Sequence, residues 1–168
     1  EDLIGVLRRF GEERYARRIA RGIVNARNET PLTTTGELSS LVDACVPTRE
    51  PGKHPATRTF QALRLFINQE LAELDAVLPQ ALDMLEPGGR LVIISFHSLE
   101  DRRVKRFFHD AAKGDPFPPD LPIRAKEISP VILRPSRPQR PSDGEISDNP
   151  RARSAILRWA QKSPSGQI

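Results

Sequence analysis

Residues 86–103, EPGGRLVIISFHSLEDRR, decide the fold that this sequence predicts. The Pro-Gly-Gly at 87–89 signals a turn, and the apolar run 91–94 that follows is too short for a helix of its own. An unbroken apolar run of this length is typical of a strand that is covered on both faces, as inside a parallel sheet. We therefore predict a buried strand over about 90–96 and an α/β fold.

A helix is expected to follow this strand, over about 99–112. Ser98 can cap its start, and Asp101, three residues on, completes the pattern of a capping box. Polar groups at the junction of a strand and a helix lie on the ligand-binding rim of an open α/β sheet. Capping is the expected role of Ser98 and Asp101, whereas Phe96 and His97 are well placed to hold a base by stacking or hydrogen bonding. Phe96 could equally be a core residue.

The composition fits one domain, or one domain with an appendage, of 168 residues. The 26 Lys and Arg against 22 Asp and Glu give a net charge of +4, so a polyanion such as RNA is a plausible partner. The single cysteine, Cys45, cannot form an internal disulfide and favours a reducing compartment. No apolar run is long enough to span a membrane, so we expect a cytoplasmic protein. The first residues, EDLIGVLRRFGEER, resemble the interior of a longer chain.

The first fifty residues predict helices over 2–10, 12–27 and 35–45, with a break at Gly11. Thr34 and Glu37 form a capping box for the third helix, and a loop over 47–55 ends this segment. The second helix carries a continuous basic stripe at positions i, i+3, i+4 and i+7, made of Arg14, Arg17, Arg18 and Arg21. The stripe is either a solvated face or a face that contacts phosphate.

The rest of the chain predicts alternating helices and strands. A long amphipathic helix over 56–86 should be kinked or ended by Pro79. A modest strand is predicted at 128–134, a long flexible loop at 135–150, a final buried strand at 154–162 and a frayed tail at 163–168.

No complete active site can be recognised from the residues alone. There is no GxGxxG, Walker, HExxH or CxxC motif, and the three histidines lie in unlike elements, so no zinc site is expected. Two further basic groups remain as candidates. Lys53, His54 and Arg58 cluster at the start of the predicted long helix, and Arg151 and Arg153 lead into the last strand.

Three long strings carry a resemblance to a known family: HPATRTFQALRLFINQEL (54–71), LEPGGRLVIISFHSLEDRRVKRF (85–107) and NPRARSAILR (149–158). They resemble the RsmH (MraW) family, S-adenosylmethionine-dependent methyltransferases that modify the N4 amino group of a cytidine in bacterial small-subunit (16S) ribosomal RNA. The string FGEERYARRIARGIV (10–24) resembles the helical domain inserted in that family.

The resemblance implies the C-terminal part of a class I (Rossmann-like) methyltransferase sheet, preceded by part of an all-helical insert domain. Residues 1–50 would belong to the insert and 51–168 to the methyltransferase domain. The strands at 90–96, 154–162 and 128–134 would be contiguous neighbours in that order. The family's cofactor motifs precede the insert and are absent here, so the S-adenosylmethionine site is expected mainly in a missing N-terminal half, and the isolated fragment is expected to be inactive.

The resemblance also implies direct methyl transfer from the sulfonium to the cytosine amino nitrogen, with ribosomal RNA in the small subunit as partner. Phe96, His97 and Ser98 would border the cytidine pocket. RNA phosphates would be held by Lys53, His54, Arg58, Arg102, Arg151 and Arg153, and by the basic stripe if it contacts RNA. No catalytic residue and no metal ligand is assigned, and a homodimer is one of the open oligomeric states.

Two functions of other classes remain open from the sequence. One is a non-catalytic RNA-binding or ribosome-assembly module, because every cofactor motif is absent. The other is a small phosphate-ester hydrolase that uses His97, Glu100 and Asp101 with a metal.

Overall fold

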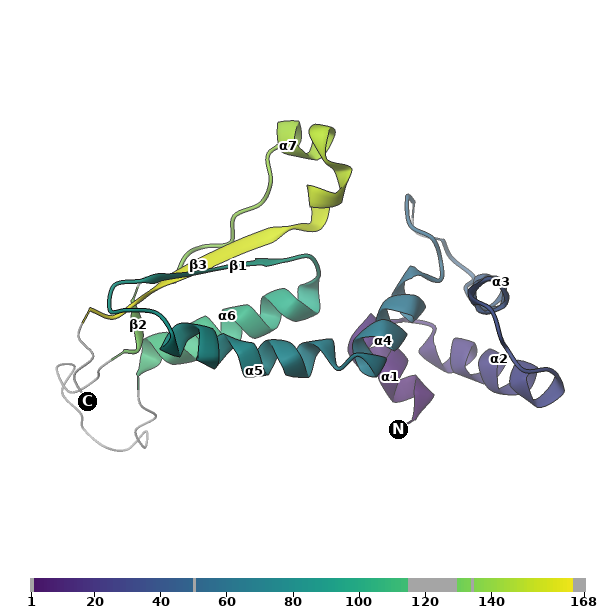
Figure 1. Cartoon of the computed structure of the whole chain (residues 1–168). Coiled ribbons are helices and arrows are strands. Elements are labelled where there is room, and N and C mark those ends of the chain that lie inside the picture. The colour runs from purple at the N-terminus through teal and green to yellow at the C-terminus, as the bar shows by residue number, and fades with distance from the viewer. Residues whose placement is uncertain (1, 50, 115–129, 134, 165–168) are drawn as a thin grey trace. The chain divides into compact units, whose positions relative to one another are not determined.

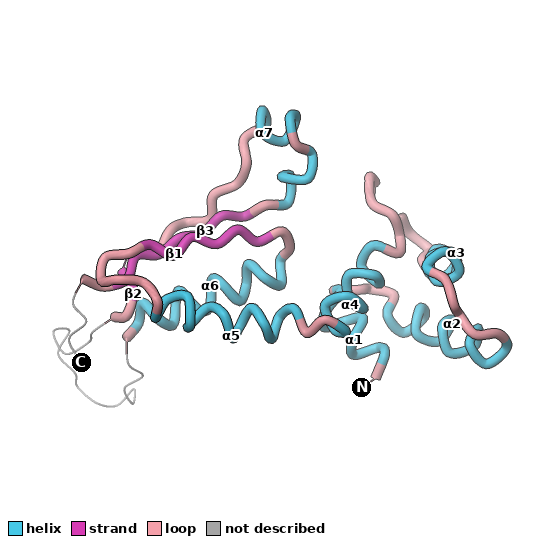
Figure 2. Tube along the Cα trace, in the orientation of Figure 1, coloured by secondary structure: helices cyan, strands magenta, loops and turns pink. Residues whose placement is uncertain are grey.

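The computed structural model describes residues 2–49, 51–114, 130–133 and 135–164, shown as ribbon and tube in Figures 1 and 2. These residues form two compact units, Glu1–Glu70 and Leu71–Ile168. The first unit is helical, and the second combines helices with a small sheet (Figure 2). The division between the two units lies after Glu70, and the helix that follows the 47–55 loop packs within the first unit.

The first unit contains α1 (Leu3–Gly11), α2 (Ala16–Glu29), α3 (Thr35–Cys45) and α4 (Thr57–Ile67). The predicted third helix is confirmed together with its capping box: Thr34 Oγ1 accepts from Glu37 N at 3.2 Å, and Glu37 Oε2 accepts from Thr34 N at 3.0 Å. The prediction that the second helix begins at residue 12 is wrong. Glu12 has a φ of 50° and caps the end of α1, so the chain turns before α2 begins at Ala16.

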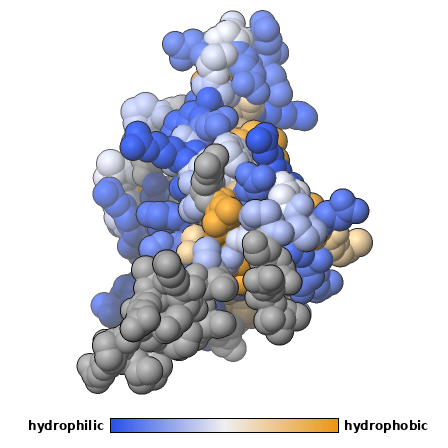
Figure 3. Space-filling model, turned by 90° about the vertical axis from the view of Figure 1, so that its left-hand side faces the viewer, coloured by the Kyte–Doolittle hydropathy of each residue, from blue (hydrophilic) through white to orange (hydrophobic). Residues whose placement is uncertain are grey.

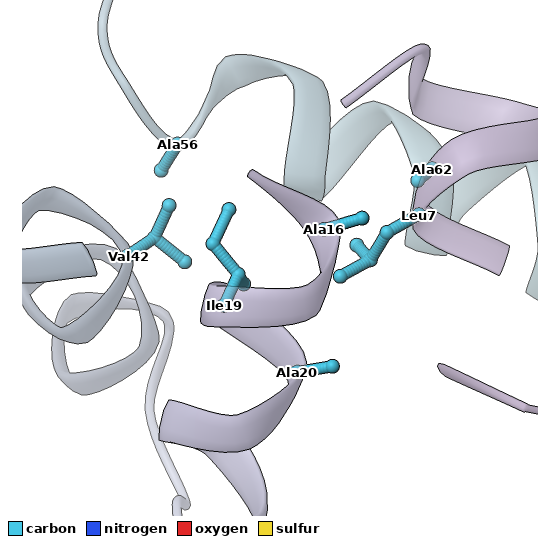
Figure 4. Packing of buried hydrophobic residues seen from close by; sticks show 7 residues of the cluster. All are labelled: Leu7, Ala16, Ile19, Ala20, Val42, Ala56 and Ala62. Carbon is cyan, nitrogen blue, oxygen red and sulfur yellow. The ribbon is translucent and has the colours of Figure 1, made fainter. Parts of the chain in front are cut away.

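A small hydrophobic core holds the four helices together (Figure 4). Ile19 of α2 lies between Val42 of α3 and Ala56, while Ala16 points toward Leu7 of α1. Gly11 is the last residue of α1, and a Cβ atom there would lie 2.6 Å from the carbonyl oxygen of Arg58. Glycine therefore allows α1 and α4 to approach closely.

The predicted helix over 56–86 is two helices, and the break is not at the proline. α4 ends at Ile67, Gln69 has a φ of 53°, and α5 (Glu70–Asp83) continues through Pro79. The sequence gives no glycine or proline signal at the break. The left-handed backbone of Gln69 interrupts the helical geometry instead.

The second unit contains β1 (Arg90–Ser95), α6 (Ser98–Lys113), β2 (Ile132–Leu133), α7 (Asp143–Asp148), a 3-10 helix at Pro150–Ser154 and β3 (Ile156–Lys162). The strand order is β1-β3-β2, which confirms the predicted neighbours. Both pairings are antiparallel, with Val92 opposite Trp159 in the first and Leu133 opposite Gln161 in the second. The apolar run of β1 predicts a strand inside a parallel sheet. Within the described residues, β1 does not lie in a parallel sheet.

Among the described residues, only one face of β1 is covered. Buried residues of α5, α6, β2 and β3 form the core of the second unit, and Leu91 and Ile93 pack against it. Val92 and Ile94 point to the opposite face and are each 54% exposed. The prediction of a strand covered on both faces is therefore wrong for the chain as described. Arg90 covers part of that open face, with its guanidinium 5.2 Å from the centre of the Trp159 ring.

The segment after β2, predicted as a long flexible loop over 135–150, contains regular structure. Ser142 caps the short helix α7, and Gln139 pairs with Leu157 as an isolated bridge beside β3. The final strand begins at Ile156 because Pro150–Ser154 forms a 3-10 turn. Residues 115–129, 134 and 165–168 lie outside the described residues, and with them most of the predicted 128–134 strand and the end of the predicted tail.

Across the described part of the chain, no helix combines the length and the apolar character that a bilayer crossing requires. The face shown in Figure 3 is hydrophilic over most of its described area, with small hydrophobic areas near its middle.

Candidate functional site

Two basic groups that lie far apart in the sequence meet at one cavity in the first unit. Its volume is about 60 Å³. Arg14 comes from the predicted stripe, and Lys53, His54 and Arg58 come from the loop and the start of α4. The remaining lining residues are Glu13, Tyr15, Val46, Thr48, Pro55 and Thr57. Three of the lining side chains are cationic and one is a carboxylate, so the cavity favours an anion.

The turn between α1 and α2 fixes one wall of this cavity. Glu13 N donates to the carbonyl oxygen of Leu7 at 3.2 Å, and Glu13 Oε1 accepts from Tyr15 N at 2.9 Å. Glu13 is only 5% exposed. Arg14 is exposed and reaches the cavity from the next position.

The start of α4 fixes the opposite wall. Ala56 N donates to His54 Nδ1 at 3.2 Å, and Thr57 N donates to the carbonyl oxygen of His54 at 3.0 Å. Because Nδ1 accepts this hydrogen bond, Nε2 is the ring nitrogen that can donate to a ligand. His54 thus offers a donor beside three cations.

The rest of the predicted stripe is exposed but does not share this cavity. Arg17 and Arg21 line a wider groove of about 500 Å³ beside Asp2, Leu3 and Ile4 of α1. Arg18 is exposed on α2 between them. The structure therefore divides the stripe between the cavity and the groove.

The turn between β1 and α6 is built differently from the prediction. His97, and not Ser98, is the N-cap of α6: its Nδ1 accepts from Glu100 N at 3.3 Å. In return, the Glu100 side chain caps the backbone before the helix: its Oε2 accepts from Phe96 N at 2.9 Å. Ser98 is the exposed first residue of the helix. Imidazole and glutamate thus replace the serine and aspartate of the expected capping box.

The two side chains of this turn face each other. His97 Nε2 lies 3.2 Å from Glu100 Oε1, without the angles of a hydrogen bond. Burial acts to raise the pKa of Glu100, but the contacts with His97 and with Phe96 N together outweigh burial and lower that pKa. Both nitrogens of His97 are therefore directed at Glu100, whereas the Phe96 ring is 55% exposed beside them.

Asp101 has a role that the sequence did not indicate. Its Oδ1 and Oδ2 accept from Arg158 Nε and Nη2 at 2.6 and 2.9 Å, and the two side chains are only 14% and 11% exposed. The hydrogen bonding that Arg158 donates to Asp101 is the main reason that the pKa of Arg158 is raised. Asp101 is turned away from His97 and Glu100 toward β3, so the three residues do not converge as a ligand set. The only sequence signal for Arg158 is its place at an inward position of the last strand.

The remaining basic candidates are exposed and lie in the second unit. Arg102 is on the outer side of α6, while Arg151 and Arg153 are in the 3-10 turn that precedes β3. The structure does not bring these three into the cavity of the first unit.

The described residues at the β1–α6 turn do not fit S-adenosylmethionine by themselves. A class I site needs an acid to hold the ribose hydroxyls. Of the two acids at this turn, Glu100 closes the cap and Asp101 holds Arg158. The described residues also contain no cluster of three His, Cys, Asp or Glu side chains that could hold a metal ion.

Comparison with known proteins gives a consistent result. The model of the MraW methylase family matches residues 1–163. Ribosomal RNA small subunit methyltransferase H of Dechloromonas aromatica is 55% identical over 162 residues, which are 96% of this chain and 53% of that protein. The proteins of the same name from Chromohalobacter salexigens and Coxiella burnetii are 54% and 55% identical, again over 96% of this chain and over 49% and 52% of theirs. The chain spans about half the length of these relatives.

Proposed function

This chain belongs to the MraW methylase family, and on that basis we propose that it is part of an enzyme that methylates small-subunit ribosomal RNA with S-adenosylmethionine. The finer proposal is that the methyl acceptor is the N4 amino group of a cytidine in 16S ribosomal RNA. Support comes from relatives whose names state ribosomal RNA small subunit methylation. We further propose that the protein acts in the cytoplasm.

In this proposal residues 51–168 belong to a class I methyltransferase domain and residues 1–50 to a helical insert domain. The order β1-β3-β2 supports the first part, because it agrees with the neighbours expected for the last strands of such a sheet. The helical character of the first unit supports the second. α4 would then belong to the methyltransferase domain in sequence while packing on α1.

The observation that carries the RNA part of the proposal is the cavity that gathers Arg14, Lys53, His54 and Arg58. Cations and an imidazole donor around a small cavity suit a phosphate of the RNA backbone. Arg17, Arg18 and Arg21 would extend the same electrostatic surface along α2, and Arg102, Arg151 and Arg153 would contribute from the second unit.

The β1–α6 turn would border the cytidine. Phe96 offers an exposed ring on which a base can stack. His97 would act as a positioning residue, because its cap contacts with Glu100 fix the backbone on which Phe96 and Ser98 are carried.

Because the described residues do not fit S-adenosylmethionine by themselves, we derive no step through it. We propose that the cofactor is held mainly by the half of the relatives that this chain does not match, and that the isolated chain is inactive. A calorimetric titration of the folded chain with S-adenosylmethionine should give no heat of binding. One-to-one binding would contradict this part of the proposal.

The function itself is tested in the source organism. We expect that disrupting the gene removes N4-methylated cytidine from 16S ribosomal RNA, measured by mass spectrometry of nucleoside digests. Re-expression of the intact gene should restore the signal. Unchanged N4-methylated cytidine in the disrupted strain would contradict the proposal.

A non-catalytic RNA-binding or ribosome-assembly module is the second candidate, because the chain has a basic cavity and its described residues at the β1–α6 turn do not fit the cofactor. It predicts that gene disruption leaves the methylated cytidine unchanged and slows the appearance of mature small subunits. Sucrose-gradient profiles of the same strain distinguish the two functions.

A further inference from the structure

A second basic cleft lies in the second unit, and Arg158, the partner of Asp101, is one of its lining residues. It has a volume of about 180 Å³ and lies between α6, β3 and the start of the segment after β2. The lining residues are Lys105, Phe108, His109, Pro135, Ser136 and Arg158. Neither the residue patterns nor the family resemblance indicated this cleft.

The helix and strand geometry explains why basic groups meet here. Asp101, Lys105 and His109 follow one another at intervals of four, so they share one side of α6. Arg158 is only 9% exposed and lies on the inward face of β3, opposite Ile93. The Asp101–Arg158 pair ties the two elements together along this side.

The third wall of the cleft, the chain at 135–136, is fixed to β3 by reciprocal hydrogen bonds. Ser136 N donates to the carbonyl oxygen of Trp159 at 2.8 Å, and Trp159 N donates to Ser136 Oγ at 2.8 Å. The chain at 135–136 therefore runs beside the strand as an extra edge. Three elements that hydrogen bonds fix to one another therefore line the cleft: α6, β3 and the chain at 135–136.

The chemistry of the lining favours an anion. The lining contains Lys105, His109 and Arg158 and no carboxylate. The contact with Asp101 uses Arg158 Nε and Nη2 and leaves guanidinium donors for a ligand. Phe108, 2% exposed, and Pro135 supply an apolar floor that strengthens charge interactions. The cleft is smaller than the roughly 300–1,000 Å³ typical of pockets for drug-sized ligands, so it suits one small group.

We propose that this cleft binds a single phosphate group through Lys105, His109 and Arg158, and that the group is a phosphodiester of the substrate RNA. The assignment to RNA rests on the proposed function. A free phosphorylated ligand would offer the same chemistry, so the experiment separates the two sources.

The first arm measures the affinity of the chain for a short single-stranded RNA across a series of salt concentrations. We compare the unmodified chain with Lys105→Gln and Arg106→Gln. Both variants remove one exposed positive charge from α6, but Arg106 does not line the cleft. Lys105→Gln should reduce the salt slope by about 0.7, the value for one phosphate contact with a single strand, whereas Arg106→Gln should leave it unchanged.

The second arm titrates inorganic phosphate and follows the histidine ring signals by NMR. The signals of His109 should shift in the unmodified chain and shift less in Lys105→Gln, while those of His97 should stay in place because both its nitrogens face Glu100. Circular dichroism confirms that each variant is folded.

A reduced salt slope specific to Lys105→Gln supports an RNA phosphodiester. A His109 response with an unchanged slope supports the phosphate site and assigns it to a free phosphorylated ligand. The proposal is overturned if the two variants have equal slopes and the His109 signals do not respond to phosphate. Neither arm measures methylation, so failure of the proposed enzyme function would show separately, in the nucleoside digests.

Discussion

At the residue scale, the Asp101–Arg158 pair joins the first turn of α6 to β3. Its side chains are 14% and 11% exposed, and two short hydrogen bonds connect them. Two charges in such a position are stabilising only while both are present, because removal of one leaves the other buried and unpaired. The pair therefore fixes the orientation of α6 on the sheet.

Asp101→Asn should lower the free energy of unfolding by about 2 kcal/mol, somewhat less than the loss from breaking a fully buried pair, because both side chains retain some exposure. Urea unfolding measures the change. Asp75→Asn is the matched control, since it breaks the more exposed pair between Asp75 of α5 and Arg103 of α6. Equal effects of the two substitutions would contradict this account of the Asp101 pair.

The Glu100 carboxylate gives the β1–α6 turn a dependence on pH. Its pKa is lowered in the folded chain, so its contribution to stability is present above the usual value of 4.5 and is lost as the pH falls through the lower folded pKa. The urea midpoint of Glu100→Gln should therefore lie below that of the unmodified chain at neutral pH, and the gap should close in acid.

The control for this pH dependence is Glu73→Gln, which removes an exposed carboxylate from α5. Its urea midpoint should differ little from that of the unmodified chain at either pH. A Glu100→Gln gap that is constant from neutral to acid pH would show that the carboxylate charge does not stabilise the cap.

At the element scale, the left-handed backbone of Gln69 separates α4 from α5. A residue with a Cβ atom is strained there by roughly 1–2 kcal/mol, and glycine is not. Gln69→Gly should therefore raise the free energy of unfolding, by up to about 1 kcal/mol after the larger entropy of the unfolded glycine chain is subtracted. Urea unfolding measures the difference.

Gln80→Gly is the matched control for this prediction, because residue 80 lies inside α5, where its side chain donates to the carbonyl oxygen of Ala76 at 2.8 Å. That substitution should be destabilising by about 1 kcal/mol. If Gln69→Gly destabilises the chain as much as Gln80→Gly, the break does not depend on backbone conformation at residue 69.

The elements that could be predicted from sequence are those with a local signal. Thr34 and Glu37 define the start of α3, and the Pro-Gly-Gly turn with its apolar run defines β1. The break at Gln69 could not be predicted, because neither Asn68 nor Gln69 is a usual helix breaker. The opposite error occurs at Pro79: this residue predicts a kink or the end of a helix, but α5 continues through it.

The candidate site could be predicted in its residue types but not in its assembly. Arg14 and Lys53 were both recognised as basic candidates, yet their meeting depends on the close approach of α1 and α4 at Gly11. Likewise, the sequence predicts that Asp101 caps the start of its own helix. Its partner Arg158 lies 57 residues away, so no local pattern could reveal the pair.

At the scale of the whole molecule, the second unit exposes apolar residues on one face of β1. Val92, Ile94 and Phe96 are each more than half exposed, and β1 is an edge of the described sheet. An open strand edge beside an apolar face favours association. We expect the chain to self-associate as its concentration rises, and Ile94→Thr to weaken this association in sedimentation velocity experiments.

Val77→Thr is the control for this prediction, because Val77 is similarly exposed but lies on α5, outside that face. Sedimentation of Ile94→Thr that matches both Val77→Thr and the unmodified chain would show that the open face does not mediate association.

We propose that the helical unit binds RNA through its basic cavity. The most direct test is the affinity of the chain for a fragment of 16S ribosomal RNA across salt concentrations, with Arg14→Gln and Lys53→Gln compared with Arg27→Gln. Arg27 is an exposed residue of the same α2 helix as Arg14 and does not line the cavity. Each cavity variant should weaken binding and reduce the salt slope by about 0.7–0.9, while Arg27→Gln should change neither. Equal slopes for all four proteins would contradict the claim.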